Sequence, residues 1–158
     1  MRVLADLQIH SRFARAVSSR MVVPEIANWA SKKGIDMVAT GDWTHPVWYR
    51  ELRSSLVEES GGLYKLKGQG EKLPLFLLST EISSVYSQGG ETRRIHTLIF
   101  APDFNAVEAI NKELSGRGVK LISDGRPVTG LSARDVADIA LSVDERCLVI
   151  PAHVWTPW

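Results

Sequence analysis

The sequence has almost no cysteine, which excludes one class of protein and makes one class of enzyme improbable. Among its 158 residues, only Cys147 carries a thiol. A single cysteine cannot form an internal disulfide framework, and this scarcity suits the reducing cytoplasm. Cys147 begins an apolar run that ends at Ile150, whereas a catalytic thiol needs an electropositive, partly exposed setting. We therefore expect neither a disulfide-stapled protein nor a thiol-dependent enzyme.

Long apolar stretches and an excess of one charge are also missing. No segment approaches the ~20 apolar residues of a membrane span, and the N-terminus has no signal-peptide core. The formal net charge is only +1, so binding to nucleic acid or to an anionic membrane would have to come from a local patch. We therefore expect a cytoplasmic protein that does not associate with membranes.

Motifs of several other enzyme classes are absent. No serine stands in a nucleophile-elbow pattern. The segment Gly68-Gln69-Gly70 lacks the lysine and the following helix of a phosphate-binding loop. There is no internal repeat, low-complexity tract or interdomain linker, and a chain of this length with 44% hydrophobic residues fits one globular domain.

What the sequence does contain is an alternation of short apolar runs and helical patterns. Pro24 suits the first turn of a helix, and Ser132 with Asp135 three residues later forms a capping-box pattern. The order strand, helix, strand predicts parallel strands with helices packed outside them, as an α/β barrel or a doubly wound sheet. The predicted strands are residues 3–5, 37–40, 75–79, 95–101, 120–123 and 148–152, and the predicted helices are 24–33, 46–59, 104–114 and 132–143.

The sequence stops at Trp158, just after the predicted strand 148–152, without a helix to cover that strand. A barrel of this kind needs further strands. We therefore expect residues 1–158 to form the N-terminal part of a longer domain.

Acids, histidines and arginines gather where the predicted strands end. Parallel α/β folds build their sites at this end of the strands. All four histidines lie at such positions. The candidates are Asp6, Gln8 and His10 after the first strand, Asp42 and His45 after the second, Glu81 after the third, Arg93, Arg94 and His96 near the fourth, and His153 after the last.

This combination of side chains predicts metal chemistry. Imidazole and carboxylate ligands together suit zinc, manganese or iron. A carboxylate such as Glu81 can bridge two ions, and a pair about 3.5 to 4 Å apart binds a phosphate ester, generates hydroxide and stabilises the leaving oxygen. Metal-assisted phosphoester hydrolysis is the natural reaction for such a cluster.

Each candidate also has a purely structural interpretation. A single histidine near a strand end often only completes the hydrogen bonds of the core, and Asp6 and Asp42 could cap loops or helices. Arg93 and Arg94, and Arg126 in its tight turn, could form surface ion pairs instead of holding phosphate oxygens. The metal interpretation depends on their joint position at the strand ends.

The same residues resemble the motifs of the polymerase-and-histidinol-phosphatase (PHP) family. Asp6-Leu7-Gln8-Ile9-His10 matches the first motif except for its first histidine, and Thr40-Gly41-Asp42 resembles the second. Glu81 resembles the bridging acid, His96 the third-motif histidine, and Pro151-Ala152-His153 the fourth motif. Within the family the chain is most similar to the endonuclease Q branch, across nearly its whole length. The segments that carry this likeness are residues 6–15, 41–46, 89–96, 123–127 and 151–158.

The resemblance implies a distorted (β/α)7 barrel, incomplete at its C-terminal end, with a cluster of two zinc ions, or of manganese or iron. It implies an enzyme that cuts DNA beside deaminated bases such as uracil and hypoxanthine. His10 and Glu81 would bind one ion, and Glu81, His96 and His153 the other. By the same likeness, the catalytic residues would be Asp6, Asp42 and Arg94, and the phosphate-binding residues would be Arg15, Arg93 and Arg126.

The chain departs from the family pattern at three places. Gln8 replaces a histidine, and its neutral amide oxygen is a weaker ligand, so the first ion should bind less tightly. Trp43 stands where many relatives have a histidine ligand, which leaves His45 as a weak substitute. The later aspartate and histidine ligands of the family, and the zinc ribbon of the endonuclease Q branch, would lie beyond Trp158.

Three functions therefore remain open for the sequence. The first is a metal-dependent endonuclease of damaged DNA, the second a small-molecule phosphatase of the same family, and the third a non-catalytic domain or fragment that holds a metal. The arginines near the motifs could hold nucleic-acid phosphates. Trp43, Trp48, Trp155 and Trp158 could stack on an extruded base or pack in a core or interface.

Overall fold

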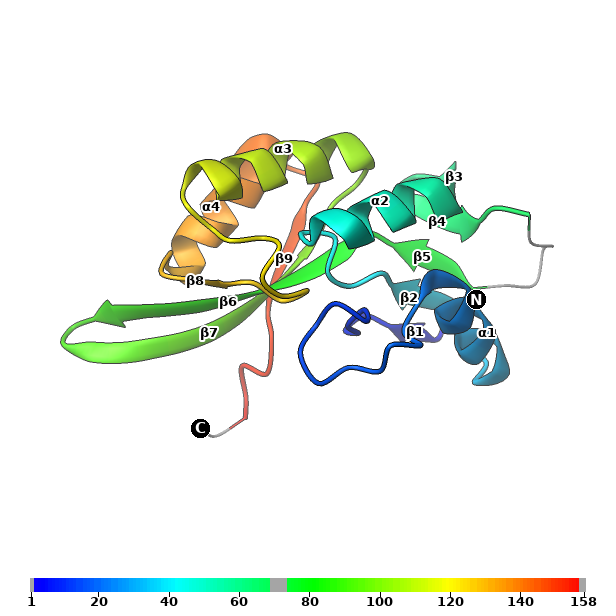
Figure 1. Ribbon diagram of the computed structural model, residues 1–158, viewed down its shortest axis with the longest axis horizontal. Helices are drawn as coiled ribbons and strands as arrows, with labels where there is room; N and C mark the ends of the chain where they lie inside the picture. Colours follow the sequence, from blue (N-terminus) through cyan, green and yellow to red (C-terminus); the bar gives the residue numbers. More distant parts are fainter. Residues whose placement is uncertain (1, 69–73, 157–158) are drawn as a thin grey trace.

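The chain folds into two β-sheets that meet at one corner, with helices packed against them (Figure 1). This architecture is described by a computed structural model of residues 2–68 and 74–156. Two predicted features fall partly outside these residues, namely the glycine-rich segment at 68–70 and the end of the last motif at 157–158.

The first sheet has the strand order β1-β2-β5-β4-β3. Strands β1 (Ala5–Asp6), β2 (Met37–Ala39) and β5 (Leu75–Leu77) run parallel to one another. Strands β4 (Leu63–Leu66) and β3 (Leu56–Ser60) continue the sheet in antiparallel orientation. Within this sheet, only β1, β2 and β5 follow the parallel arrangement that the sequence predicts.

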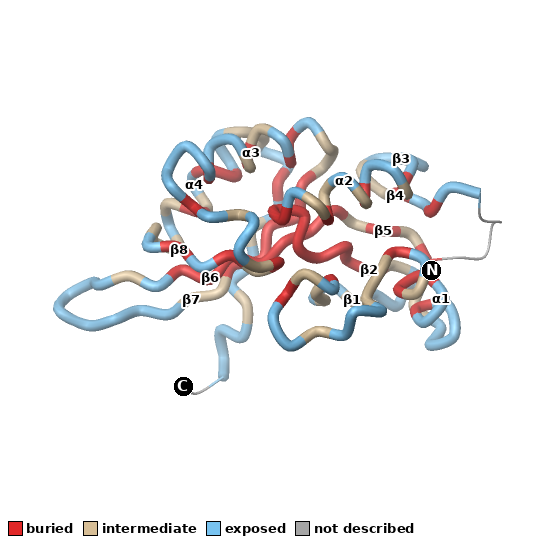
Figure 2. The backbone as a smooth tube through the Cα atoms, viewed as in Figure 1, coloured by how far each residue is buried: buried red, intermediate tan, exposed pale blue. Residues whose placement is uncertain are grey.

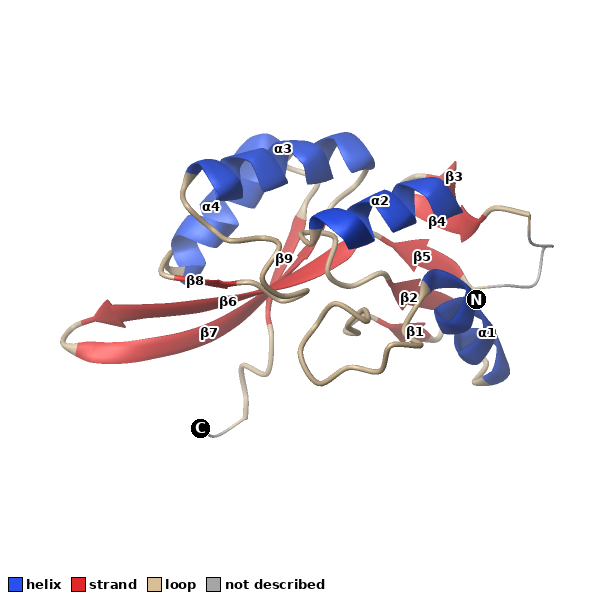
Figure 3. Cartoon of the chain, in the orientation of Figure 1, coloured by secondary structure: helices blue, strands red, loops and turns tan. Residues whose placement is uncertain are grey.

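The second sheet has the order β8-β6-β7-β9 and is built on a long antiparallel hairpin. Strand β6 (Ser79–Gln88) pairs with β7 (Glu91–Phe100) along its whole length, and the outer part of this hairpin projects from the body (Figure 3). Strand β9 (Leu148–Pro151) pairs with β7, and the short β8 (Val128–Thr129) pairs with β6.

The helices begin close to the residues that the sequence predicts. They are α1 (Val23–Lys32), α2 (Pro46–Ser55), α3 (Phe104–Gly116) and α4 (Ala133–Val143). Pro24 lies in the first turn of α1, and the Ser132 side chain accepts a hydrogen bond from the Asp135 backbone in a complete capping box. Because α3 packs on α4 and α4 packs on β7, these helices support the second sheet.

The two sheets meet where β5 passes into β6. Strand β5 ends at Leu77, the Leu78 carbonyl accepts a hydrogen bond from the backbone of Ala101, and β6 then begins in the other sheet. Buried residues are concentrated around this junction (Figure 2). Leu78 and Ile82 are fully buried on either side of Glu81, so the junction fixes Glu81 beside the main core.

The largest side chains of the core are two tryptophans. Trp43 and Trp48 are fully buried, and the Trp48 indole nitrogen donates to the Gly41 carbonyl at 2.8 Å. Burying an indole whose N–H has a partner gains the hydrophobic contribution without a polar penalty. Trp43 packs in the same core, although its buried indole nitrogen has no hydrogen-bond partner among the described residues.

Three predictions of local structure are wrong. The helix predicted over 46–59 ends at Ser55, because Leu56 turns into the core as the first residue of β3. No strand forms at 120–123, where the Ser123 backbone closes a turn on the Lys120 carbonyl and Ile122 is exposed. Most of β6 is missing from the prediction, since its polar residues show no apolar period and it is defined by its pairing with β7.

The complete barrel implied by the family resemblance is also not seen. The described residues form two mixed sheets whose edge strands β1, β3, β8 and β9 do not close on one another. The α/β class is confirmed.

A separate finding is that no helix in residues 2–68 and 74–156 is long and apolar enough to cross a membrane.

Candidate metal centre

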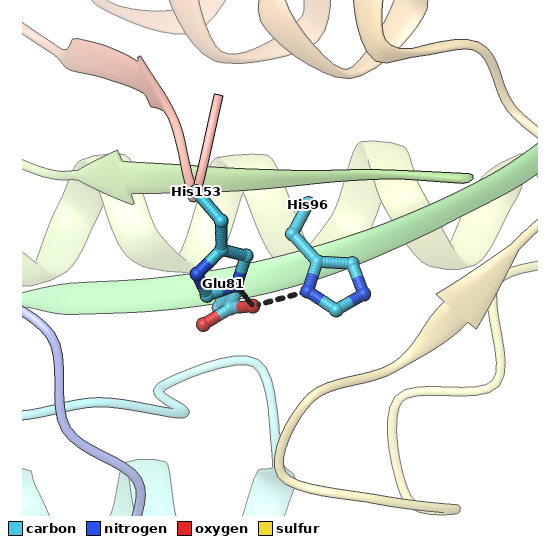
Figure 4. Close-up of side chains that lie close together, drawn as sticks. All are labelled: Glu81, His96 and His153. Carbon is cyan, nitrogen blue, oxygen red and sulfur yellow. Dashed lines mark ion pairs between the residues drawn. The ribbon is translucent and has the colours of Figure 1, made fainter. Parts of the chain in front are cut away.

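The centre of the candidate site is the buried carboxylate of Glu81, whose two oxygens face different groups. On one side, Oε1 lies 2.8 Å from His96 Nδ1, 3.8 Å from His153 Nε2 and 3.6 Å from Arg126 Nη1. Figure 4 shows both imidazoles directed at this carboxylate. Glu81 itself is only 2% exposed. Burying a carboxylate is costly unless it is paired, and here three nitrogen-bearing side chains surround one oxygen.

The second oxygen of Glu81 faces the first sequence motif. The Gln8 amide nitrogen donates to Oε2 at 3.0 Å, and His10 Nε2 lies 3.3 Å from the same atom. Rotation of the Gln8 amide by half a turn would direct its neutral oxygen to this side instead. Glu81 therefore lies between the first motif and the two later histidines.

His10 is held in place by a second buried acid. Its Nδ1 lies 2.8 Å from Asp42 Oδ1, while Asp42 Oδ2 accepts from the Ser11 backbone at 2.6 Å and the Ser11 hydroxyl at 2.8 Å. Because Asp42 fixes Nδ1, Nε2 of the ring is directed at Glu81. Asp42 is fully buried and lies behind the histidine. The structure thus places the predicted catalytic aspartate where it positions His10.

Strand register explains why the later ligands converge. On the β6–β7 hairpin, Glu81 pairs with Leu98 and Ser83 pairs with His96, so Glu81 and His96 share one face. His153 follows β9, and the Ala152 backbone donates to the His96 carbonyl at 2.8 Å. Two strands and one turn therefore bring the three side chains together.

The donor set fits a divalent cation of the zinc type. The ligand atoms of Glu81, His96 and His153 all lie within 4.8 Å of one another. Ligands of a tetrahedral zinc ion lie roughly 3.4 Å apart, since each is about 2.0 to 2.2 Å from the metal. Small rotations of these side chains would bring their ligand atoms to the spacing found around zinc. Imidazole and carboxylate are also suitable donors for such an ion. The residues present therefore match such an ion.

The electrostatics of the site couple the acids and histidines strongly. Burial alone would raise the pKa of Glu81, but the hydrogen bonds from His10 and Gln8 lower it to about 2. The hydrogen bonds of His10 to Asp42 and Glu81 raise the pKa of His10 to about 9. Burial lowers the pKa of His96, which favours the neutral imidazole that metals bind. Without metal, a proton on His10 partly balances the acids.

A cavity of about 790 Å³ opens beside the two later histidines. Among the described residues that line it, two are arginines, two are histidines and none is acidic. The lining residues are Ser83, Arg94, Ile95, His96, Arg126, Ala133, Pro151, Ala152, His153 and Val154. Its charged residues suit an anion, and its wall also offers apolar surface.

Two predicted site residues lie elsewhere. Asp6 lines a different cavity, near α1, and accepts a hydrogen bond from the Gln8 backbone. The His45 ring stacks on Phe13 at a centroid distance of 4.3 Å, and burial lowers its pKa. The structure groups neither residue with Glu81, His96 and His153.

The fold separates the arginines predicted for the site, which are the catalytic candidate Arg94 and the phosphate-binding candidates Arg15, Arg93 and Arg126. Arg94 pairs with Val85 and Arg93 with Tyr86, so these neighbours point to opposite faces of the hairpin. Arg94 lines the cavity, whereas Arg93 forms an ion pair with Glu91 at 2.9 Å. Arg15 is exposed on the loop between β1 and α1, and Arg126 lies at the cavity.

Two residues that support the site were not singled out as site residues from the sequence. Ser11 donates to Asp42 through both its backbone and its hydroxyl. Gly125 packs so closely that a Cβ atom there would lie 2.5 Å from Asp42 Oδ2 and 2.8 Å from the Ala14 nitrogen. Its position directly after His10 could have indicated the role of Ser11. Gly125 could not have been identified in this way, because its contact with Asp42 joins loops that are distant in the sequence.

The fold is similar to that of two solved structures. The structure of the lesion-specific endonuclease PfuEndoQ from Pyrococcus furiosus matches 99% of this chain with a TM-score of 0.82 and 33% sequence identity. An endonuclease Q complex with a 27-mer duplex substrate, with an abasic lesion at the active site, matches 98% with a TM-score of 0.80 and 32% identity. This chain resembles part of endonuclease Q. The resemblance predicted from the motifs is thereby confirmed across nearly the whole chain.

The chain covers only part of the proteins it resembles. It spans 36% and 35% of the two endonuclease Q chains. A curated relative, the uncharacterized protein MJ0043 of Methanocaldococcus jannaschii, is 28% identical over 152 residues, which is 96% of this chain and 16% of that protein. No family model matches the chain.

Proposed function

We propose that the chain forms the metal-binding part of a divalent-metal phosphodiesterase that cuts DNA beside deaminated bases. One observation carries this proposal. The two oxygens of the buried Glu81 carboxylate face separate sets of ligands, with His10 on one side and His96 and His153 on the other. A carboxylate in this position is suited to bridge two cations.

The ligands divide into a stronger and a weaker set. Glu81, His96 and His153 would hold one ion, and His10 with Glu81 would hold the other, where Gln8 could offer only a neutral amide oxygen. Zinc suits these donors, and manganese or iron are the alternatives. When bound, such ions supply a hydroxide nucleophile and stabilise charge on the phosphate and the leaving oxygen.

The protein's own side chains would bind and orient the substrate. Arg126 is partly exposed and lies 3.6 Å from Glu81, and Arg94 lines the same cavity. Two guanidinium groups beside the metal ligands can hold phosphate oxygens by charge-assisted hydrogen bonds. Asp42 would keep His10 in one tautomer and orientation.

The choice of DNA as substrate is supported by the two solved structures. One is a lesion-specific endonuclease, and the other holds duplex DNA with an abasic lesion at its active site. Uracil and hypoxanthine are the deaminated bases that the motif resemblance implies.

Metal analysis tests the centre directly. The purified chain should retain zinc after dialysis, and Glu81→Gln should lose most of it because the shared ligand loses its charge. Glu91→Gln, at the exposed start of β7, is the matched control and should retain the wild-type content. An absence of zinc, manganese and iron from the wild-type chain, even after incubation with each, would overturn the proposal.

A nicking assay tests the substrate. Duplexes with one uracil or hypoxanthine should be nicked beside that base by the zinc-loaded chain, while undamaged duplexes and a phosphate monoester are left intact. Cleavage of the monoester alone would identify a small-molecule phosphatase. Metal binding without any cleavage would identify a non-catalytic metal-binding domain in these residues.

A further inference from the structure

A smaller cavity lies where the loop after α3 meets the edge strand β8 (Figure 1). Its volume is about 350 Å³, near the lower end of the range for ligand cavities, which is about 300 to 1,000 Å³. It is lined by residues 117–120, Ser123 and residues 128–131. Among these described residues Arg117 and Lys120 are charged and none is acidic, so the cavity suits an anion.

The two cations have no partner within the described part of the chain. Both are exposed, and neither forms an ion pair or a side-chain hydrogen bond with the described residues. The charge of Arg117 helps to lower the pKa of Asp135, but hydrogen bonds from Ser132 are the main cause. The Asp135 carboxylate accepts from the Ser132 backbone at 2.9 Å and from its hydroxyl at 2.6 Å. Both positive charges therefore remain available to an external anion.

A cation at the end of a helix often serves the helix itself, but α3 does not need the Arg117 side chain. The last carbonyls of the helix already accept hydrogen bonds from the backbone. The Leu114 carbonyl accepts from the Val119 nitrogen at 3.0 Å, and the Ser115 carbonyl accepts from the Gly118 nitrogen at 2.9 Å. Helix capping therefore does not explain the guanidinium group at the cavity.

The polar groups around the cavity are held in fixed positions. The Lys120 carbonyl accepts from the Ser123 backbone at 3.2 Å and from its hydroxyl at 2.7 Å, which closes the turn that carries Lys120. The Thr129 hydroxyl accepts from the Leu131 backbone at 3.1 Å and keeps its own proton for another acceptor. Two cations and a hydroxyl donor match the several oxygens of a phosphate group.

One segment of the chain connects this cavity with the cavity at the candidate metal centre. Arg126 lines the larger cavity, and residues 128–131 line the smaller. Val128 pairs with Ser83, which also lines the larger cavity. The Cα atoms of Arg126 and Thr129 are three residues apart and so lie within about 11 Å of each other. Each DNA strand carries a phosphate about every 3.4 Å along the duplex axis, so one strand can reach both cavities.

We propose that the cavity at Arg117 and Lys120 binds a backbone phosphate of DNA, a few nucleotides to one side of the phosphate at the metal centre. This inference rests on the proposed function and adds a second contact to it. The connection between the cavities favours a polymer with regularly spaced phosphates over an isolated anion. A backbone contact of this kind positions the strand without reading its sequence.

The salt dependence of binding tests the contact. The double variant Arg117→Gln with Lys120→Gln should bind a fluorescein-labelled, uracil-containing duplex about tenfold more weakly at low salt, because a charge-assisted contact is lost. Its plot of log Kd against log salt concentration should be less steep by about 0.9, the change expected for one phosphate. Zinc content and melting temperature should equal those of the wild type. Lys112→Gln removes an exposed charge from α3 away from the cavity and is the matched control.

Duplexes with one flank shortened locate the contact. For the wild type, removal of one flank should reproduce the loss of affinity, and removal of the other should not, because the contact lies to one side of the uracil. For the double variant, shortening the same flank should have little further effect, since the contact is already absent.

Gly130 provides an independent test that leaves both cations in place. A Cβ atom there would meet nothing within 4 Å, so a side chain fits at the cavity. Gly130→Asp should repel the phosphate and weaken duplex binding about tenfold. Gly130→Asn has almost the same shape without the charge and should bind nearly like the wild type.

The possible failures are distinguishable. If the double variant binds the duplex like Lys112→Gln, or responds to shortened flanks as the wild type does, the phosphate assignment is wrong while the proposed function stands. If calorimetry shows that inorganic phosphate binds the wild type and not the double variant, while both bind the duplex equally, the cavity takes free phosphate, which also overturns the assignment. If the zinc-loaded wild-type chain does not bind the uracil-containing duplex, the proposed function itself fails.

Discussion

Asp42 affects the candidate site without being exposed to it. Its carboxylate is fully buried and accepts hydrogen bonds from Ser11 while it holds His10. A buried charge is costly unless it is paired, and these partners offset that cost. The same contacts fix the direction of the His10 ring. The Asp42 carboxylate therefore contributes both to the stability of the fold and to the geometry of the site.

The first prediction at this scale concerns the metal-free chain. The pKa of His10 is raised from 6.5 to about 9 by hydrogen bonds to Asp42 and Glu81. A group whose pKa is higher in the folded state stabilises that state below its unfolded pKa, and this contribution is lost as pH rises through the folded value. The stability of the chelator-treated chain should therefore decline between pH 6.5 and about 9.

Urea denaturation across this pH range measures the effect. In His10→Gln the same decline should be absent or much smaller, because the titrating imidazole is gone. A parallel decline in both proteins would show that other groups are responsible. Zinc should flatten the wild-type curve, since a coordinated imidazole no longer binds a proton.

At the scale of elements, the β6–β7 hairpin decides which side chains face the cavity. Side chains alternate along a strand, so one residue of register moves a side chain to the opposite face. Arg94 lies on the face of His96 and Glu81, and Arg93 lies on the other, where it pairs with Glu91. The sequence predicts Arg94 as a catalytic residue and Arg93 as a phosphate-binding residue, but of the two only Arg94 lines the cavity.

This register makes a paired prediction. Arg94→Ala should weaken binding of the zinc-loaded chain to a uracil-containing duplex about tenfold, because a charge-assisted phosphate contact is lost. Arg93→Ala removes the same charge from the neighbouring residue and should weaken binding much less. Anisotropy titrations at two salt concentrations would measure both. Equal losses would indicate a diffuse electrostatic effect and not a directed contact.

At the same scale, a tight approach fixes the first motif to the second strand. Gly41 has a φ of +63°, and a Cβ atom there would lie 2.4 Å from the Ile9 carbonyl oxygen. No side chain fits between these segments, and the left-handed backbone favours glycine. The loop that carries His10 is therefore held directly against the residue that precedes Asp42.

At the scale of the whole molecule, the candidate centre joins parts that are far apart in the sequence. His10 lies before α1, Glu81 and His96 lie on the hairpin, and His153 lies after β9. A cation bound between them would link both sheets. The ligands lie together only in the folded state, so the cation binds the folded chain and not the unfolded one. Binding should therefore stabilise the fold.

Thermal unfolding tests this linkage. Zinc at about 100 times its dissociation constant should add about 2.7 kcal/mol to the unfolding free energy and raise the melting temperature. A chelator should reverse the shift, and Glu81→Gln should show almost none. An equal zinc-induced shift in wild type and Glu81→Gln would place the stabilising ion elsewhere.

The sequence by itself determined the α/β class, the starts of the helices and the types of side chain at the site. Local signals carry this information. The Ser132 capping box lies within four residues, and His10, Glu81, His96 and His153 each stand beside a recognisable apolar run or motif. The resemblance to endonuclease Q also followed from these motifs and is confirmed by the two solved structures.

Only the tertiary structure decided how those side chains meet. It paired the polar strand β6 with β7, placed Arg93 and Arg94 on opposite faces and directed the two oxygens of Glu81 to different histidines. It also buried Trp43 and left Trp155 in solvent. Strand pairing, register and burial depend on contacts between residues distant in the chain, and such contacts leave no period or spacing in the local sequence.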